Sequence, residues 1–97
     1  MCKSEVFNRV LNVVSREMEI DVDEIIGKGR TIEVVDARCM LFKLLHEEGL
    51  YPSQIAEKAH RTSASVRYLL SDFNTRVASN VILEKTLKKV RKQLANN

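Results

Sequence analysis

Apolar residues recur along most of the chain at steps of three and four residues, which is the spacing of one face of an α-helix. The first such segment runs from Ser4 to Met18, with Ser4 as the expected N-cap and Glu5 in the first turn, where a negative charge is favourable. Its apolar stripe consists of Val6, Val10, Leu11, Val14 and Met18.

Two further helices are expected before residue 50. Asp21-Val-Asp-Glu24 has the pattern of a capping box and predicts a very short helix that ends at Gly27-Lys-Gly29. Thr31 can cap the next helix, and Gly49 marks its end. Apolar residues nearly encircle that helix in its middle, so we expect it to be the central, buried one; they include Val34, Val35, Ala37, Met40, Leu41, Leu44 and Leu45.

The stretch from residue 50 to 73 reads as two helices joined by a tight turn. Pro52 suits the first turn of a helix, where its missing N–H costs nothing. His60-Arg61 is the expected turn, and Thr62 the expected cap of the second helix. The spacing predicts a helix-turn-helix at about residues 52–73, with inward-facing anchors Ile55, Ala56, Ala59, Val66, Leu69, Leu70 and Phe73.

A last helix is expected after Asn80, which can cap it. Its lysines and Arg91 are interpreted as a solvated face, and its expected inner face consists of Ile82, Leu83, Leu87, Val90 and Leu94. The chain has no alternating strand pattern and no internal repeat. We therefore expect a single all-α domain of about six helices over residues 1–97.

Composition excludes several classes of protein. No apolar run approaches the roughly 18–20 residues that span a bilayer, and the N-terminus lacks the apolar core of a signal peptide, so the cytoplasm is the expected compartment and no membrane partner is predicted. Cys2 and Cys39 fit no metal-binding spacing, and Cys39 reads as a small core residue. No phosphate loop, catalytic constellation or metal motif is present, which argues against an enzyme, a cofactor or a small-molecule substrate.

Charge is unevenly distributed along the chain. Residues 1–27 carry three Lys or Arg against six Asp or Glu, whereas residues 28–97 carry thirteen against seven. A basic C-terminal two-thirds is suited to a polyanionic partner, although many small proteins also have a basic side.

The start of the second helix of the helix-turn-helix offers the chemistry of a DNA reader. Ser63, Ala64 and Ser65 have short side chains, so the helix could lie deep in a major groove, with hydroxyls at base edges and Ala64 near a thymine methyl. Arg61 and Arg67 bracket them as candidate contacts. The competing interpretation is a helical hairpin with a solvated polar face.

These residues, together with the segments before them, resemble the C-terminal DNA-binding domain of the bacterial replication initiator DnaA, a Trp-repressor-like helix-turn-helix. The likeness covers about Val6 to Leu94. It is carried by VLNVVSREMEIDVDEIIGKGRTIEVVDAR, with its acidic-capped short helix, basic loop and Ala-Arg step, and by the Ser-Gln-Ile-Ala segment that matches the family's Pro-Glu-Ile-Gly. The sequence does not include the ATPase domain that precedes this domain in an initiator, so we expect either an excised fragment or a stand-alone relative, and Met1 with its adjoining helix favours the latter.

The resemblance implies roles for individual residues. Arg30 matches an arginine that enters the minor groove, and Arg38 matches one that contacts the DNA backbone; an ion pair with Asp36 or Glu33 is the alternative for Arg38. Arg61, Ser63, Ala64 and Ser65 are the further expected groove or base contacts, and the remaining expected phosphate contacts are Lys28, Ser53, Thr62 and Arg67.

The chain departs from the family in its most specific motif, where Gly-Gly-Arg-Asp-His-Thr-Thr-Val becomes His60-Arg-Thr-Ser-Ala-Ser-Val66. Arg61 and Val66 carry over, but the base-reading His and the first Thr do not. The expected partner is double-stranded DNA, in replication initiation or transcriptional regulation. The second hypothesis is a protein-interaction module that kept the fold and lost DNA, in which case the arginines at 30, 38, 61 and 67 would scatter or be engaged in ion pairs.

Overall fold

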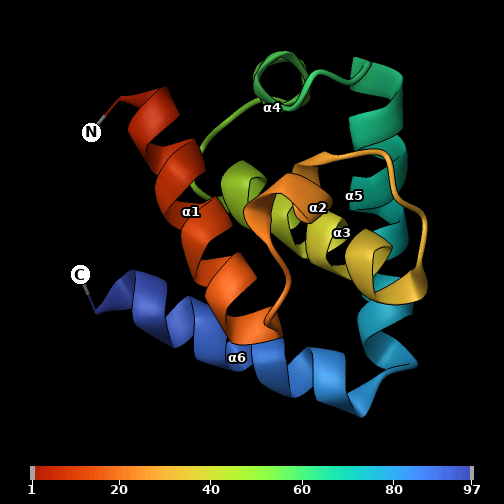
Figure 1. Cartoon of the computed structure of the whole chain (residues 1–97). Coiled ribbons are helices and arrows are strands. Elements are labelled where there is room, and N and C mark those ends of the chain that lie inside the picture. Colours follow the sequence, from red (N-terminus) through yellow and green to blue (C-terminus); the bar gives the residue numbers. More distant parts are fainter. Residues whose placement is uncertain (1, 97) are drawn as a thin grey trace.

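A computed structural model describes residues 2–96, and that part of the chain is helical throughout except for its connections (Figure 1). It contains six helices and no strand, which confirms the all-α prediction. The helices are α1 (Lys3–Met18), α2 (Val22–Ile26), α3 (Ile32–Glu47), α4 (Pro52–Ala59), α5 (Ser63–Ala78) and α6 (Val81–Ala95).

Helix α3 is the centre of the fold. It packs against α1, α2, α4 and α5, while α6 closes the opposite side by packing against α1 and α5 (Figure 1). Residues Cys39 to Phe42 are completely buried, as expected for a helix whose apolar residues nearly encircle it. Asp36 and Arg38 are also buried in this helix, and no buried polar side-chain atom in residues 2–96 lacks a hydrogen-bond partner.

Most of the predicted helix ends are confirmed. The side chains of Thr31, Thr62 and Asn80 accept hydrogen bonds from the backbone N–H three residues later, and these bonds satisfy donors that a helix start leaves free. Pro52 occupies the first turn of α4. Gly49 follows the end of α3 with a φ of 102°, in the left-handed region that glycine adopts without strain.

Three local predictions are wrong. Helix α1 begins at Lys3, and the Ser4 hydroxyl accepts a hydrogen bond from Lys58 Nζ instead of capping the helix. The Asp21 side chain makes no capping bond; its backbone carbonyl accepts from Glu24 N instead. Ile82 points outward with 77% of its surface exposed, because the inner face of α6 begins at Leu83.

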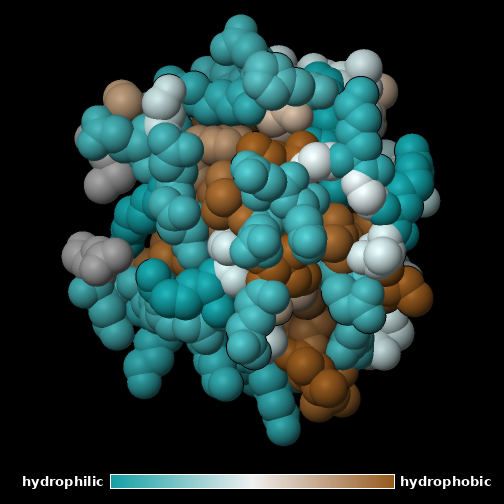
Figure 2. All heavy atoms as spheres, in the orientation of Figure 1, coloured by the Kyte–Doolittle hydropathy of each residue, from teal (hydrophilic) through white to brown (hydrophobic). Residues whose placement is uncertain are grey.

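Hydrophilic residues cover most of the face shown in Figure 2, and a brown apolar cluster projects at its lower edge, below the junction of α5 and α6 in Figure 1. Val81 and Ile82, at the start of α6, are among the large apolar residues that the fold leaves exposed. Small exposed apolar patches of this kind are common on protein surfaces.

The two cysteines should differ sharply in reactivity. Cys39 is buried between α3 and α5, where its thiol donates to the Leu69 carbonyl at 2.9 Å, and burial raises the pKa of this thiol to about 12. Because the thiolate is the reactive form, Cys39 should resist a disulfide reagent at pH 8 while exposed Cys2 reacts. We expect one fast equivalent of thiol in the folded protein and two after denaturation. Cys2→Ser should abolish the fast phase; two fast equivalents in the native protein would contradict the burial of Cys39.

Candidate nucleic-acid interface

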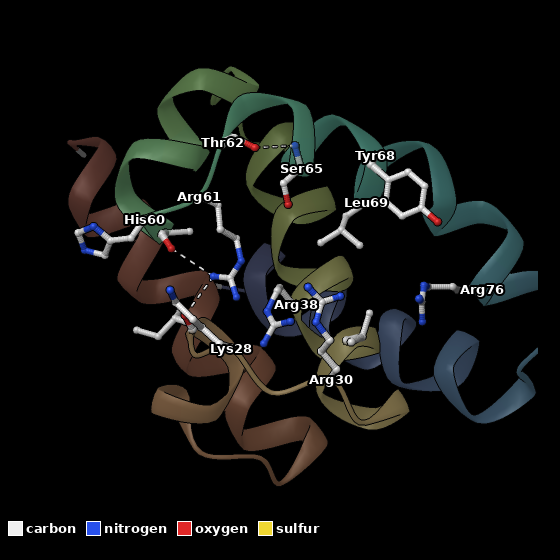
Figure 3. Close-up of a pocket in the computed structure, with 13 residues that line it drawn as sticks. Lys28, Arg30, Arg38, His60, Arg61, Thr62, Ser65, Tyr68, Leu69 and Arg76 are labelled. Atoms are coloured by element: carbon white, nitrogen blue, oxygen red, sulfur yellow. Dashed lines mark hydrogen bonds between the residues drawn. The ribbon is translucent and has the colours of Figure 1, made fainter.

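A groove runs between the connection that joins α2 to α3 and the first half of α5 (Figure 3). We call that connection, residues 27–31, the basic loop because it carries Lys28 and Arg30. The groove has a volume of about 690 Å³, and residues from both walls line it. Five of its lining residues are cations, namely Lys28, Arg30, Arg38, Arg61 and Arg76.

Arg38 holds the basic loop in place from beneath. Its side chain is only 6% exposed, and its guanidinium donates to the carbonyls of Ile25 at 2.8 Å, Gly27 at 2.8 Å, Gly29 at 3.1 Å and Glu24 at 3.4 Å. These carbonyls belong to the end of α2 and the loop after it, where a helix leaves acceptors without intrahelical partners. The guanidinium supplies partners for these carbonyls, of which that of Glu24 also accepts from Gly27 N.

This placement argues against the predicted phosphate contact of Arg38, because nearly all of its N–H donors are already used inside the protein. The phosphate contact stays a prediction, whereas the alternative, an ion pair with Asp36 or Glu33, is wrong, because Arg38 forms no ion pair among residues 2–96. Asp36 instead binds Arg76 of α5 at 2.8 Å, and Arg76 also binds Asp72 at 2.7 Å. Arg38, although it belongs to α3, therefore serves to hold the basic loop in place.

Arg61, in the turn of the helix-turn-helix, also binds the basic loop and the end of α2. Helix α4 ends at Ala59, His60 takes a left-handed conformation with φ of 56°, and Arg61 N closes the turn on the Ala56 carbonyl at 2.9 Å. The Arg61 guanidinium then reaches back and donates to the carbonyls of Ile26 at 3.0 Å, Ala59 at 3.1 Å and Gly27 (Figure 3). It also lies over the buried ring of Phe42, 6.0 Å from its centre.

The turn of the helix-turn-helix and the basic loop are thus joined by one side chain. Both terminal nitrogens of Arg61 donate to backbone carbonyls, whereas the sequence predicts that this guanidinium approaches base edges. That base contact stays a prediction, and it competes with the bonds that hold the loop.

Burial and neighbouring positive charge disfavour the charged form of Arg38. Burial lowers the pKa of Arg38 to about 10, with repulsion from Arg61 and Arg30 adding to the effect, and burial also lowers the pKa of Arg61. Backbone carbonyls supply dipoles to these two arginines, but none of the ion pairs recorded in residues 2–96 involves Arg30, Arg38 or Arg61. An anion in the groove would therefore relieve an unbalanced positive charge.

Lys28 and Arg30 extend into solvent from the basic loop. Both are exposed, and neither makes a hydrogen bond or an ion pair within the described part of the chain. The fixed loop beneath them means that two free cations are presented from a defined position (Figure 3). The predicted contacts, Arg30 in the minor groove and Lys28 at a phosphate, require both side chains to be exposed, and they are.

The first turn of α5 forms the other wall. Thr62 Oγ1 accepts from Ser65 N at 3.1 Å and so caps the start of α5. The hydroxyl proton of Thr62 is still available as a hydrogen-bond donor. Ala64 and Ser65 are exposed, and Ser63 is half-buried. The turn presents a short, mostly polar surface, as the sequence predicts. Thr62 and Ser65 line the groove, whereas Ser63 and Ala64 do not.

The remaining predicted contacts lie outside the groove. Arg67 is exposed on α5 without a hydrogen bond or ion pair among residues 2–96, and Ser53 is exposed in the first turn of α4. Of the four arginines that distinguish the two hypotheses, three line one groove, and the fourth, Arg67, is exposed on α5 outside it. None of the four is in a recorded ion pair with a carboxylate.

Sequence reasoning missed Tyr68 and Arg76, both of which line the groove. Tyr68 follows Ser65 by three residues and therefore shares its side of α5, which was the available signal. Arg76 carried no comparable signal, because its partner Asp36 lies forty positions away in the sequence.

Comparison of the sequence with protein-family models and with curated proteins found no match. The resemblance to the DnaA domain accordingly stays a prediction that rests on the motifs. Among residues 2–96, no cluster of three or more His, Cys, Asp or Glu could hold a metal ion. The helices of this part of the chain are all too short or too polar to cross a membrane.

Proposed function

We propose that this protein binds double-stranded DNA in a sequence-dependent manner, with α4 and α5 as the helix-turn-helix and the basic loop as a second contact. The observation that carries the proposal is that the start of α5 and the basic loop are the two walls of one cationic groove. A recognition helix needs exposed N-terminal residues for base edges and donors beside it for phosphates. Ala64 and Ser65 supply the first, and Lys28, Arg30 and Arg67 supply the second.

Electrostatics supports a polyanion over an acidic peptide of a few charges. Arg38 is partly buried and is repelled by Arg61 and Arg30, and Lys28 and Arg30 have no internal acceptor in the described residues. A duplex carries a phosphate charge every 1.7 Å or so along its axis, which can satisfy several separated cations at once. The short side chains of the first turn of α5 also suit a close approach to base edges.

Removing the side chain of Arg30 should weaken DNA binding most where the minor groove is narrow. We expect Arg30→Ala to lower affinity about tenfold for a duplex that contains an A·T tract, since such tracts attract arginine, and by less for a G·C-rich duplex. The slope of log affinity against log salt should become shallower by about 0.9 if a phosphate contact is lost as well. Fluorescence anisotropy with labelled duplexes at two salt concentrations measures both quantities.

Lys89→Ala is the matched control, because Lys89 is an exposed cation on α6 that does not line the groove. It removes the same unit of charge and should leave both affinity and salt slope nearly unchanged. Equal losses in the two variants would show that only net charge matters. Failure of the unmodified protein to bind any duplex from a random pool at low salt would overturn the proposed function.

A further inference from the structure

The width of the major groove determines which parts of the DNA a recognition helix contacts. The major groove is about 12 Å wide, and an α-helix with its side chains is about 10–12 Å across. A helix seated in that groove therefore contacts both of the sugar–phosphate strands that border it. If α5 enters a major groove, as the proposed function requires, its side that faces the basic loop meets one of these strands.

Two exposed side chains lie on that side of α5. Ser65 and Tyr68 line the groove, and Leu69 beside them is buried in the core (Figure 3). Tyr68 keeps 66% of its surface exposed, and its phenolic hydroxyl makes no hydrogen bond within residues 2–96. An aromatic ring at the edge of a cationic groove, with a free donor at its tip, suits a partner that is both apolar and anionic.

We propose that this groove holds one sugar–phosphate strand of the duplex and that Tyr68 is a DNA-contact residue on its α5 wall. The Tyr68 hydroxyl donates to a phosphate oxygen, and the ring packs against the neighbouring deoxyribose. Lys28 and Arg30 approach the same strand from the opposite wall of the groove. The inference rests on the proposed function, and it adds the strand's position and a contact that none of the cationic residues provides.

The salt dependence of affinity distinguishes the Tyr68 contact from the contacts of the cationic residues. A neutral hydroxyl displaces no counterion from DNA, whereas a lysine that neutralises a phosphate does. We expect Tyr68→Phe to lower affinity about tenfold at every salt concentration, with an unchanged salt slope, because a hydrogen bond to a charged group is lost. Lys28→Ala should instead make the slope shallower by about 0.9.

Tyr51→Phe is the matched control, because Tyr51 is 67% exposed and does not line the groove. Thermal unfolding of both phenylalanine variants should match that of the unmodified protein, so a loss of binding cannot be a loss of fold. Affinity of Tyr68→Phe within twofold of Tyr51→Phe would overturn this inference while DNA binding itself stands. No binding by the unmodified protein would instead overturn the proposed function, and the inference with it.

Discussion

Replacing Arg38 by methionine should lower the free energy of unfolding by about 3–5 kcal/mol, the largest effect expected of any single cation in this chain. Methionine fills much of the same volume but donates nothing to the four carbonyls that Arg38 now satisfies. The buried carbonyl of Ile25 is then left without a partner, which costs about 1–3 kcal/mol, and the bond to Gly29 is lost as well. The carbonyls of Glu24 and Gly27 keep their bonds from Gly27 N and Arg61. Urea denaturation followed by far-ultraviolet circular dichroism measures the change.

Arg67→Met is the control for this substitution. Arg67 is exposed and has no internal hydrogen bond in the described residues, so its loss should change stability by no more than about 0.5 kcal/mol. Arg38→Lys should recover only part of the stability, because a point-like ammonium cannot reach all four carbonyls. Arg38→Met and Arg67→Met proteins of equal stability would mean that the carbonyls find water or other partners once the guanidinium is gone.

The second large effect is expected at Arg61, where removal of the guanidinium should release the basic loop from the helix-turn-helix. We expect Arg61→Ala to cost about 2–3 kcal/mol of stability, since its hydrogen bonds to Ile26, Gly27 and Ala59 are lost together. Affinity for specific and non-specific duplexes should fall alike, about 10- to 100-fold, because Lys28 and Arg30 are no longer held at a fixed position. Anisotropy titrations with both duplexes measure the losses.

Limited trypsin digestion gives a readout of the loop that is independent of DNA. Cleavage after Lys28 should accelerate about tenfold or more in Arg61→Ala, as local opening becomes easier. Arg67→Ala should weaken DNA binding without changing the cleavage rate, because Arg67 lies outside the groove and makes no contact with the loop. If Arg61→Ala instead lost only its preference for specific duplexes while cleavage stayed slow, Arg61 would be a base reader as the sequence predicts.

Arg38 and Arg61 also show what could not be predicted from the sequence. Arg30, Arg38, Arg61 and Arg67 look alike in the sequence, each next to a helix end or within a helix of mixed character. In the structure two of them bind backbone carbonyls and two extend into solvent. An arginine's partner depends on which elements meet, and most of the carbonyls bound by Arg38 and Arg61 belong to another segment of the chain, that of Ala59 beside Arg61 being the exception.

Local features of the chain were predictable for a physical reason. The positions of Thr31, Thr62, Asn80, Pro52 and Gly49 mark helix ends because capping and backbone restriction act over three or four residues. Ser4 and Asp21 show the limit of the same reasoning. Both are residue types that favour a cap, yet Lys58 binds the hydroxyl of the first and a backbone carbonyl serves for the second.

The sequence by itself determined the six helices, the central place of α3 and the short polar turn at the start of α5, because these follow from apolar periodicity and residue type alone. Only the tertiary structure decided which cations are free, that the basic loop lies across from α5, and that Tyr68 lines the groove between them. The reason is that a hydrogen bond or a groove wall needs two segments at a defined separation. Residue spacing along one helix cannot specify that separation; packing around α3 does.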